Sequence, residues 1–106
     1  MSQHYFRPIP SIVILMGWDR PLQGFYLVIE QADNDDDTVI YSNLEDPNLQ
    51  ELGGMSSSLD YLLARIVDLK LNVPQAMINE IRADAAHNIG SRSLRWNEQG
   101  VEVCNA

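Results

Sequence analysis

The sequence predicts an α+β domain in which two consecutive helices pack on one face of an antiparallel sheet. β-branched and aromatic runs fill the first part of the chain, apolar residues at helical spacing occupy the middle, and polar and apolar residues alternate near the end. With 106 residues, the chain is expected to form a single domain over residues 1–106. The predicted order is β-β-β-α-α-β-β, a three-stranded meander and a C-terminal hairpin around the helices.

The first predicted strand covers residues 11–18, where apolar and β-branched side chains follow one another with almost no polar break. Such a run is typical of a strand that is covered on both faces or buried at a dimer seam. Pro8 and Pro10 disfavour a helix immediately before it. Residues 24–30 and Thr38–Ser42 are predicted to complete the meander, because a loop rich in glycine and proline and then an acidic turn separate these runs.

Two helices follow, each with one apolar stripe. The first stripe has the i, i+3, i+4, i+7, i+8 spacing of a buried helix face and consists of Leu59, Leu62, Leu63, Ile66 and Val67. The second stripe consists of Met77, Ile78, Ile81 and Ala85. Pro74 separates the helices, since the residue before a proline avoids the helical region, and Gly90 is placed to end the second helix. The connection is short, so the helices are expected to form a tight corner.

The closing hairpin is predicted from residues 91–96 and 101–103. Leu94 and Trp96 alternate with polar neighbours, as do Val101 and Val103. The intervening residues include Gly100, which suits a left-handed turn position.

The net charge of −8 is concentrated in one stretch of the chain. Between positions 31 and 60 there are eight acidic residues and no Lys or Arg: Asp33, Asp35, Asp36, Asp37, Glu45, Asp46, Glu51 and Asp60. The other residues carry seven acids against seven Lys or Arg, so their charges cancel. A chain that looks anionic by its pI is therefore expected to be dipolar, with part of its surface able to meet an anionic partner.

The tip of the acidic stretch resembles a calcium loop only in its first positions. A calcium-binding EF-hand needs glycine at position 6 and glutamate at position 12, but these positions hold Thr38 and Leu44. We interpret the tip as a solvated turn that also discourages edge pairing of strands. The open alternative is a docking site for a basic protein partner, formed by Asp33, Asp35, Asp36 and Asp37.

No motif in the chain indicates a reaction. His4 and His87 have no nucleophile or paired carboxylate at informative spacing, and Gly53-Gly54 lacks the rest of a phosphate-binding loop. Cys104 is the single cysteine, which excludes an internal disulfide and a cysteine-based zinc site. We expect a cytoplasmic protein that is not an enzyme and has no metal or other cofactor. The longest apolar run, residues 12–17, is too short to span a bilayer.

The best predicted nucleic-acid surface lies near the C-terminal hairpin. Basic and aromatic residues gather there around one acid, and the candidates are Arg82, His87, Arg92, Arg95 and Trp96. On an exposed strand, these arginines would hold phosphates and Trp96 would stack on a base. The alternative is that the arginines pair with acids of the same molecule or its dimer mate. Two known DNA-binding motifs are less favoured. The expected DNA-reading face of a helix–turn–helix would carry one cation here, and that of a ribbon–helix–helix would carry none.

Residues 17–26, GWDRPLQGFY, resemble a family of small uncharacterised proteins encoded on plasmids and integrated mobile elements of plant-associated and environmental proteobacteria. In that family a strand leads into a Gly-aromatic-Asp loop, and an acidic tip and two helices follow. The resemblance implies that the protein is encoded on a mobile element, but it implies no biochemical activity. In this loop, Trp18 is expected to pack against Tyr26, while Asp19 and Arg20 either shape the turn or, with Trp18, bind a partner.

These observations predict an accessory or regulatory protein of a mobile element that binds DNA through the C-terminal arginines. The rival prediction is a protein-interaction module that docks a basic partner on the acidic segment 31–60. A homodimer is also predicted, because the strand at residues 12–16 is apolar on both faces.

Overall fold

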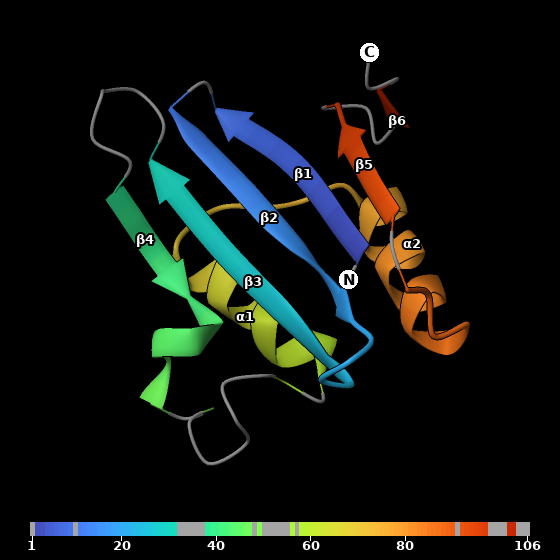
Figure 1. Ribbon diagram of the computed structural model, residues 1–106. Helices are drawn as coiled ribbons and strands as arrows, with labels where there is room; N and C mark the ends of the chain where they lie inside the picture. Colours follow the sequence, from blue (N-terminus) through green and yellow to red (C-terminus); the bar gives the residue numbers. More distant parts are fainter. Residues whose placement is uncertain are drawn as a thin grey trace.

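The computed structural model describes residues 2–9, 11–31, 38–47, 49, 56, 58–90, 92–97 and 102–103. It shows an α+β fold in which a twisted sheet lies in front of two helices (Figure 1). In chain order the elements are β1 (Ser2–Ile9), β2 (Ile12–Asp19), β3 (Gly24–Gln31), β4 (Thr38–Ser42), the short 3₁₀ turn η1 (Asn43–Glu45), α1 (Leu59–Asp68), α2 (Gln75–Ala86), β5 (Arg92–Trp96) and β6 (Glu102–Val103).

The six strands form one mixed sheet in the order β4-β3-β2-β1-β5-β6. The predicted meander is confirmed, because β2, β3 and β4 pair antiparallel, and the predicted hairpin is confirmed by the antiparallel β5–β6 pair. The prediction of a wholly antiparallel sheet is wrong, since β5 pairs parallel with β1. A parallel pair needs a crossover connection, and here the chain crosses one face of the sheet through α1 and α2 before it returns beside β1.

The first strand, β1, was not predicted, so the observed order has four strands before the helices. Its side chains do alternate between buried and more exposed positions, as in any half-buried strand. The buried positions are Ser2, His4 and Phe6, and two of these are polar. The apolar alternation that identifies a strand from sequence is therefore missing in β1.

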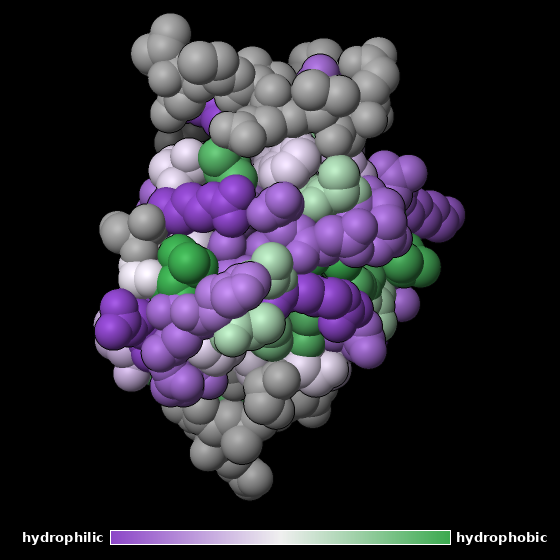
Figure 2. All heavy atoms as spheres, turned by 90° about the vertical axis from the view of Figure 1, so that its right-hand side faces the viewer, coloured by the Kyte–Doolittle hydropathy of each residue, from purple (hydrophilic) through white to green (hydrophobic). Residues whose placement is uncertain are grey.

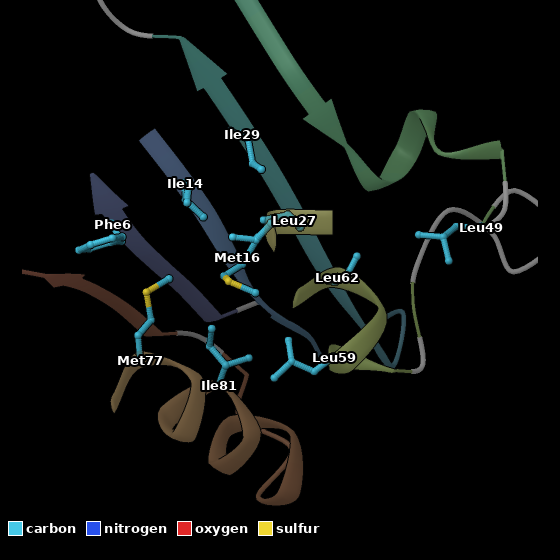
Figure 3. Close-up of a cluster of buried hydrophobic side chains, with 11 residues drawn as sticks. Phe6, Ile14, Met16, Leu27, Ile29, Leu49, Leu59, Leu62, Met77 and Ile81 are labelled. Atoms are coloured by element: carbon cyan, nitrogen blue, oxygen red, sulfur yellow. The ribbon is translucent and has the colours of Figure 1, made fainter. Parts of the chain in front are cut away.

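Both helices cover the same face of the sheet, α1 against β3 and α2 against β1 and β2. Between them lies one apolar core, shown in Figure 3. It contains Phe6, Ile14, Met16, Leu27, Ile29, Leu49, Leu59, Leu62, Ile66, Met77 and Ile81. The predicted helix stripes are largely confirmed, with two differences: Val67 is 68% exposed, and Asp84 is fully buried.

Gly17 allows the start of β1 to lie close against β2. A Cβ atom at Gly17 would stand 2.2 Å from the backbone oxygen of Ser2. Tyr26 lies opposite Gly17 in the β2–β3 register, and its hydroxyl donates a hydrogen bond of 2.5 Å to that same oxygen. The Ser2 side chain in turn accepts a hydrogen bond of 2.9 Å from the backbone N–H of Trp18. Burial raises the pKa of Tyr26, and the nearby Tyr5, Asp19 and Asp84 raise it further.

Candidate nucleic-acid interface

The alternation of β5 divides the predicted arginine surface between two faces of the sheet. Arg92 and Trp96 share rows with Ser2 and Phe6 of β1, on the face that the helices cover. Arg95 shares a row with Tyr5 and points to the helix-free face. Arg92 therefore faces the helices and Arg95 faces away from them, although only two residues separate the two arginines.

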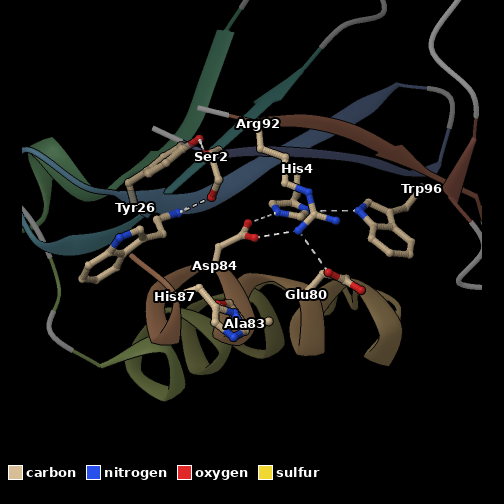
Figure 4. A network of polar contacts seen from close by, with 10 residues as sticks. Ser2, His4, Tyr26, Glu80, Ala83, Asp84, His87, Arg92 and Trp96 are labelled. Atoms are coloured by element: carbon tan, nitrogen blue, oxygen red, sulfur yellow. Dashed lines mark hydrogen bonds and ion pairs between the residues drawn. The ribbon is translucent and has the colours of Figure 1, made fainter. Parts of the chain in front are cut away.

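Arg92 belongs to a polar network between α2, β1 and β5, drawn in Figure 4. Its guanidinium donates hydrogen bonds of 2.7 Å to Asp84 and 3.1 Å to Glu80. Partial burial lowers the pKa of Arg92, but the hydrogen bonds and negative charges of Asp84 and Glu80 outweigh it, so the pKa is raised overall. Asp84 is buried, and Arg92 is the cation that balances its charge.

His4 completes this network as a neutral side chain. The indole N–H of Trp96 donates a hydrogen bond of 3.0 Å to Nδ1 of His4. Because an indole N–H only donates, Nδ1 must accept, and the ring proton sits on Nε2. Nε2 then donates the 2.6 Å hydrogen bond to Asp84. With both His4 and Asp84 fully buried, the pair has no contact with solvent and holds Trp96 in place.

The sequence contained one signal for this network that was missed. Asp84 follows Met77 by seven residues and Ile81 by three, which is the spacing of the buried stripe of α2. A carboxylate at such a position requires a buried cation or donors. The partners come from β1 and β5, and that choice depends on the tertiary fold.

Arg82 and His87 lie on the helix side of the molecule. Arg82 pairs with Asp60 of α1 at 2.7 Å, and both side chains are at least half exposed. His87 follows α2 directly, is exposed, and places its Nδ1 3.0 Å from the carbonyl oxygen of Ala83. These residues do not line the same surface as Arg95. Pairing within the molecule therefore accounts for Arg82 and Arg92.

A cavity of about 390 Å³ lies near the ends of β1 and β5. Tyr5 and Arg95, on the helix-free face, line it together with Arg7 and Val13, and the lining is completed by Phe6 and Trp96, whose row faces the helices. The Arg95 guanidinium lies over the Tyr5 ring, with its central carbon 5.7 Å from the ring centroid. No described acid lines this cavity, in a chain whose net charge is −8. Two arginines beside an aromatic ring have the chemistry that suits a planar anionic ligand.

Two other cavities differ in chemistry. One of about 250 Å³ on the helix-free face is mostly apolar and includes Asp19 in its lining. Another of about 380 Å³ lies between β4 and α1 and has three acids, Glu45, Asp46 and Asp68, against Arg65. Figure 2 views the molecule from the β5 and α2 side, where hydrophilic side chains predominate and hydrophobic ones form small separate areas.

Residues of the 17–24 loop mainly build local structure. Trp18 packs edge-on against Phe25 at 5.2 Å between ring centroids, so the predicted contact of Trp18 with Tyr26 is wrong. The reason is register: Tyr26 lies opposite Gly17, and its side chain therefore projects to the other face. Asp19 accepts a hydrogen bond from the Leu22 backbone N–H at 3.2 Å, as expected for a turn. Arg20 is exposed and its side chain lies near Gly90.

The acidic tip falls outside the described residues. Asp33, Asp35, Asp36 and Asp37 lie between β3 and β4, and their role as a docking site for a basic partner stays a prediction. Among the residues that the structure describes, no group of three or more His, Cys, Asp or Glu side chains is arranged to hold a metal ion. The helices of the described chain are all too short or too polar to cross a membrane.

No protein-family model, curated protein or solved structure matches this chain.

Proposed function

We propose that this protein is a non-enzymatic accessory or regulatory protein of a mobile element, and that it binds DNA through the helix-free face where β1 meets β5. The observation that carries the proposal is the cavity beside Tyr5, which has Arg7 and Arg95 in its lining and no described acid. The mobile-element setting rests on the resemblance of residues 17–26.

The chemistry of the site suits the phosphates and bases of DNA. Arginine holds phosphate oxygens with several N–H donors in a fixed plane, and an aromatic ring offers a stacking surface to a base. Arg7 and Arg95 project from neighbouring strands beside Tyr5, so one strand of nucleic acid can meet both kinds of group at once. We also propose that the protein acts in the cytoplasm.

Binding is expected to be weak and sensitive to salt. The cavity supplies two cations, and the remainder of the protein is acidic. For single strands each phosphate contact contributes about −0.7 to the slope of log K against log salt, so two contacts correspond to a slope of about −1.4. The interaction should therefore be measured at low ionic strength.

The test is fluorescence anisotropy of labelled single-stranded and duplex DNA with the wild-type protein and an Arg7→Ala/Arg95→Ala variant. We expect the wild type to bind and the double variant to lose most of the affinity and of the salt slope. Arg20→Ala/Arg82→Ala is the matched control, because it also removes two exposed cations, neither of which lines the cavity. Arg92→Ala is unsuitable, since it also disrupts the network around Asp84.

Two results would refute the proposal. One is the absence of DNA binding by the wild type at low salt. The other is equal loss of affinity in Arg20→Ala/Arg82→Ala and Arg7→Ala/Arg95→Ala, which would indicate nonspecific attraction to any exposed cation.

A further inference from the structure

We infer that the cavity beside Tyr5 seats one unpaired base of a single DNA strand, which stacks on the Tyr5 ring while Arg95 moves to the adjoining phosphate. This inference rests on the proposed function and specifies its ligand, since DNA binding by itself does not require an unpaired base.

The shape of the site favours an unpaired base. At about 390 Å³ the cavity is within the range of roughly 300–1,000 Å³ that is usual for small-ligand sites. In a duplex both faces of a base are covered by its neighbours, so a base enters a pocket only when it is single-stranded or flipped out. Duplex DNA can approach this face through its phosphates, but it cannot fill the cavity.

The contact between Arg95 and Tyr5 indicates how the base is received. Arg95 is exposed, and its planar guanidinium lies above the Tyr5 ring. A base has a larger planar surface, and base–aromatic stacking is stronger than a solvent-exposed cation–π contact. A base can therefore replace the guanidinium on the ring, and the displaced Arg95 remains close enough to meet the phosphate of the same strand.

The aromatic residues of the cavity are anchored by strand pairing and by the buried network. Tyr5 lies within β1, which pairs with β2 on one side and with β5 on the other. Trp96, also in the lining, is held by its hydrogen bond to His4, which is fixed by the buried Asp84. A pre-formed site loses little conformational entropy on binding, which suits a ligand with few contacts.

The experiment compares three probes: a short fluorescein-labelled thymidine strand, the same strand with abasic sites, and a duplex of equal length. Tyr5→Leu removes the ring but keeps an apolar side chain, and Tyr5→Phe keeps the ring. Chemical denaturation of each variant establishes that it is folded. Loss of one stacked base is expected to lower affinity about 5- to 150-fold.

We expect the thymidine strand to bind more tightly than either other probe. Tyr5→Leu should weaken its binding to the level of the abasic strand, Tyr5→Phe should restore it, and Tyr5→Leu should not weaken the abasic strand further. Equal binding of thymidine and abasic strands, or no effect of Tyr5→Leu, would overturn the inference. If duplex DNA then still binds through Arg7 and Arg95, the proposed DNA binding stands and only the seating of a base fails. If no probe binds, the proposed function and this inference both fail.

Discussion

Gly17 is a position where Ser2 leaves no room for a side chain. The added Cβ of alanine would lie 2.2 Å from a backbone oxygen, which cannot move aside as a flexible side chain can. The Tyr26 hydroxyl also bonds to that oxygen, so a shift of Ser2 breaks a second contact. One residue without a side chain thus allows the start of β1 to dock.

We predict that Gly17→Ala lowers the free energy of unfolding by about 1–3 kcal/mol, the usual cost of overpacking a tight site. Urea denaturation measures the change. Gly90→Ala is the matched control, because its Cβ would meet only the Arg20 side chain, at 3.0 Å. Equal stability of the two variants would contradict the role given to Gly17.

At the scale of elements, Asp84 connects α2 to two strands, β1 and β5, that are far apart in the sequence. Asp84 is hydrogen-bonded to His4 of β1 and to Arg92 of β5, and His4 in turn accepts a hydrogen bond from Trp96 of β5. Since β1 and β5 pair parallel and have no short turn between them, this network supports the pairing from the helix side.

We predict that Asp84→Ala lowers the free energy of unfolding by about 3 kcal/mol or more, because breaking a buried ion pair leaves uncompensated polar groups. Asp60→Ala removes the other aspartate–arginine pair of 2.7 Å, which is exposed, and should cost about 0–1 kcal/mol. Thermal denaturation of both variants distinguishes the contribution of burying an aspartate–arginine pair from the contribution of the pair itself. A similar loss in both would show that burial of Asp84 adds nothing.

At the scale of the whole molecule, two tyrosines with raised pKa values are expected to make the fold sensitive to alkali. Burial raises the pKa of Tyr26. Burial also raises the pKa of Tyr41, and its 2.6 Å hydrogen bond to Asp46 raises it further. In the unfolded chain both titrate near pH 10. A folded-state pKa above the unfolded value gives stability that is complete below about pH 10 and is lost as pH rises toward the folded value.

We therefore predict that the free energy of unfolding falls with increasing pH above about 10. Urea denaturation at a series of alkaline pH values measures the slope, and absorbance of the phenolate follows ionisation. Tyr41→Phe should reduce the slope, since it removes one of the two groups. An unchanged slope in Tyr41→Phe would rule out this tyrosine as a cause.

The sheet has two unlike faces, one covered by the helices and one without helices. Ile14 and Met16 of β2 lie in the core beneath the helices, whereas Val13 and Leu15 lie on the helix-free face and are half-buried. The predicted homodimer would use these outer side chains and stays a prediction. It would compete with DNA for the same face, so the two activities can be distinguished by measuring one in the presence of the other.

Local periodicity in the sequence by itself determined both helices, the meander of β2, β3 and β4, and the closing hairpin. These elements were predictable because neighbouring residues carry the pattern of burial. Strand β1 was not, since the polar residues Ser2 and His4 occupy two of its three buried positions. Their polar groups are satisfied by Trp18, Asp84 and Trp96, which only the folded chain brings to them.

The tertiary structure also decided what the C-terminal arginines do. Sequence proximity grouped Arg82, Arg92 and Arg95, but proximity along a chain does not specify a shared surface. Strand alternation turns Arg92 toward Asp84 and Arg95 toward Tyr5, and Arg82 meets Asp60 across the two helices. Charge and periodicity are local properties of a sequence, whereas the partner of each charge is chosen by long-range packing.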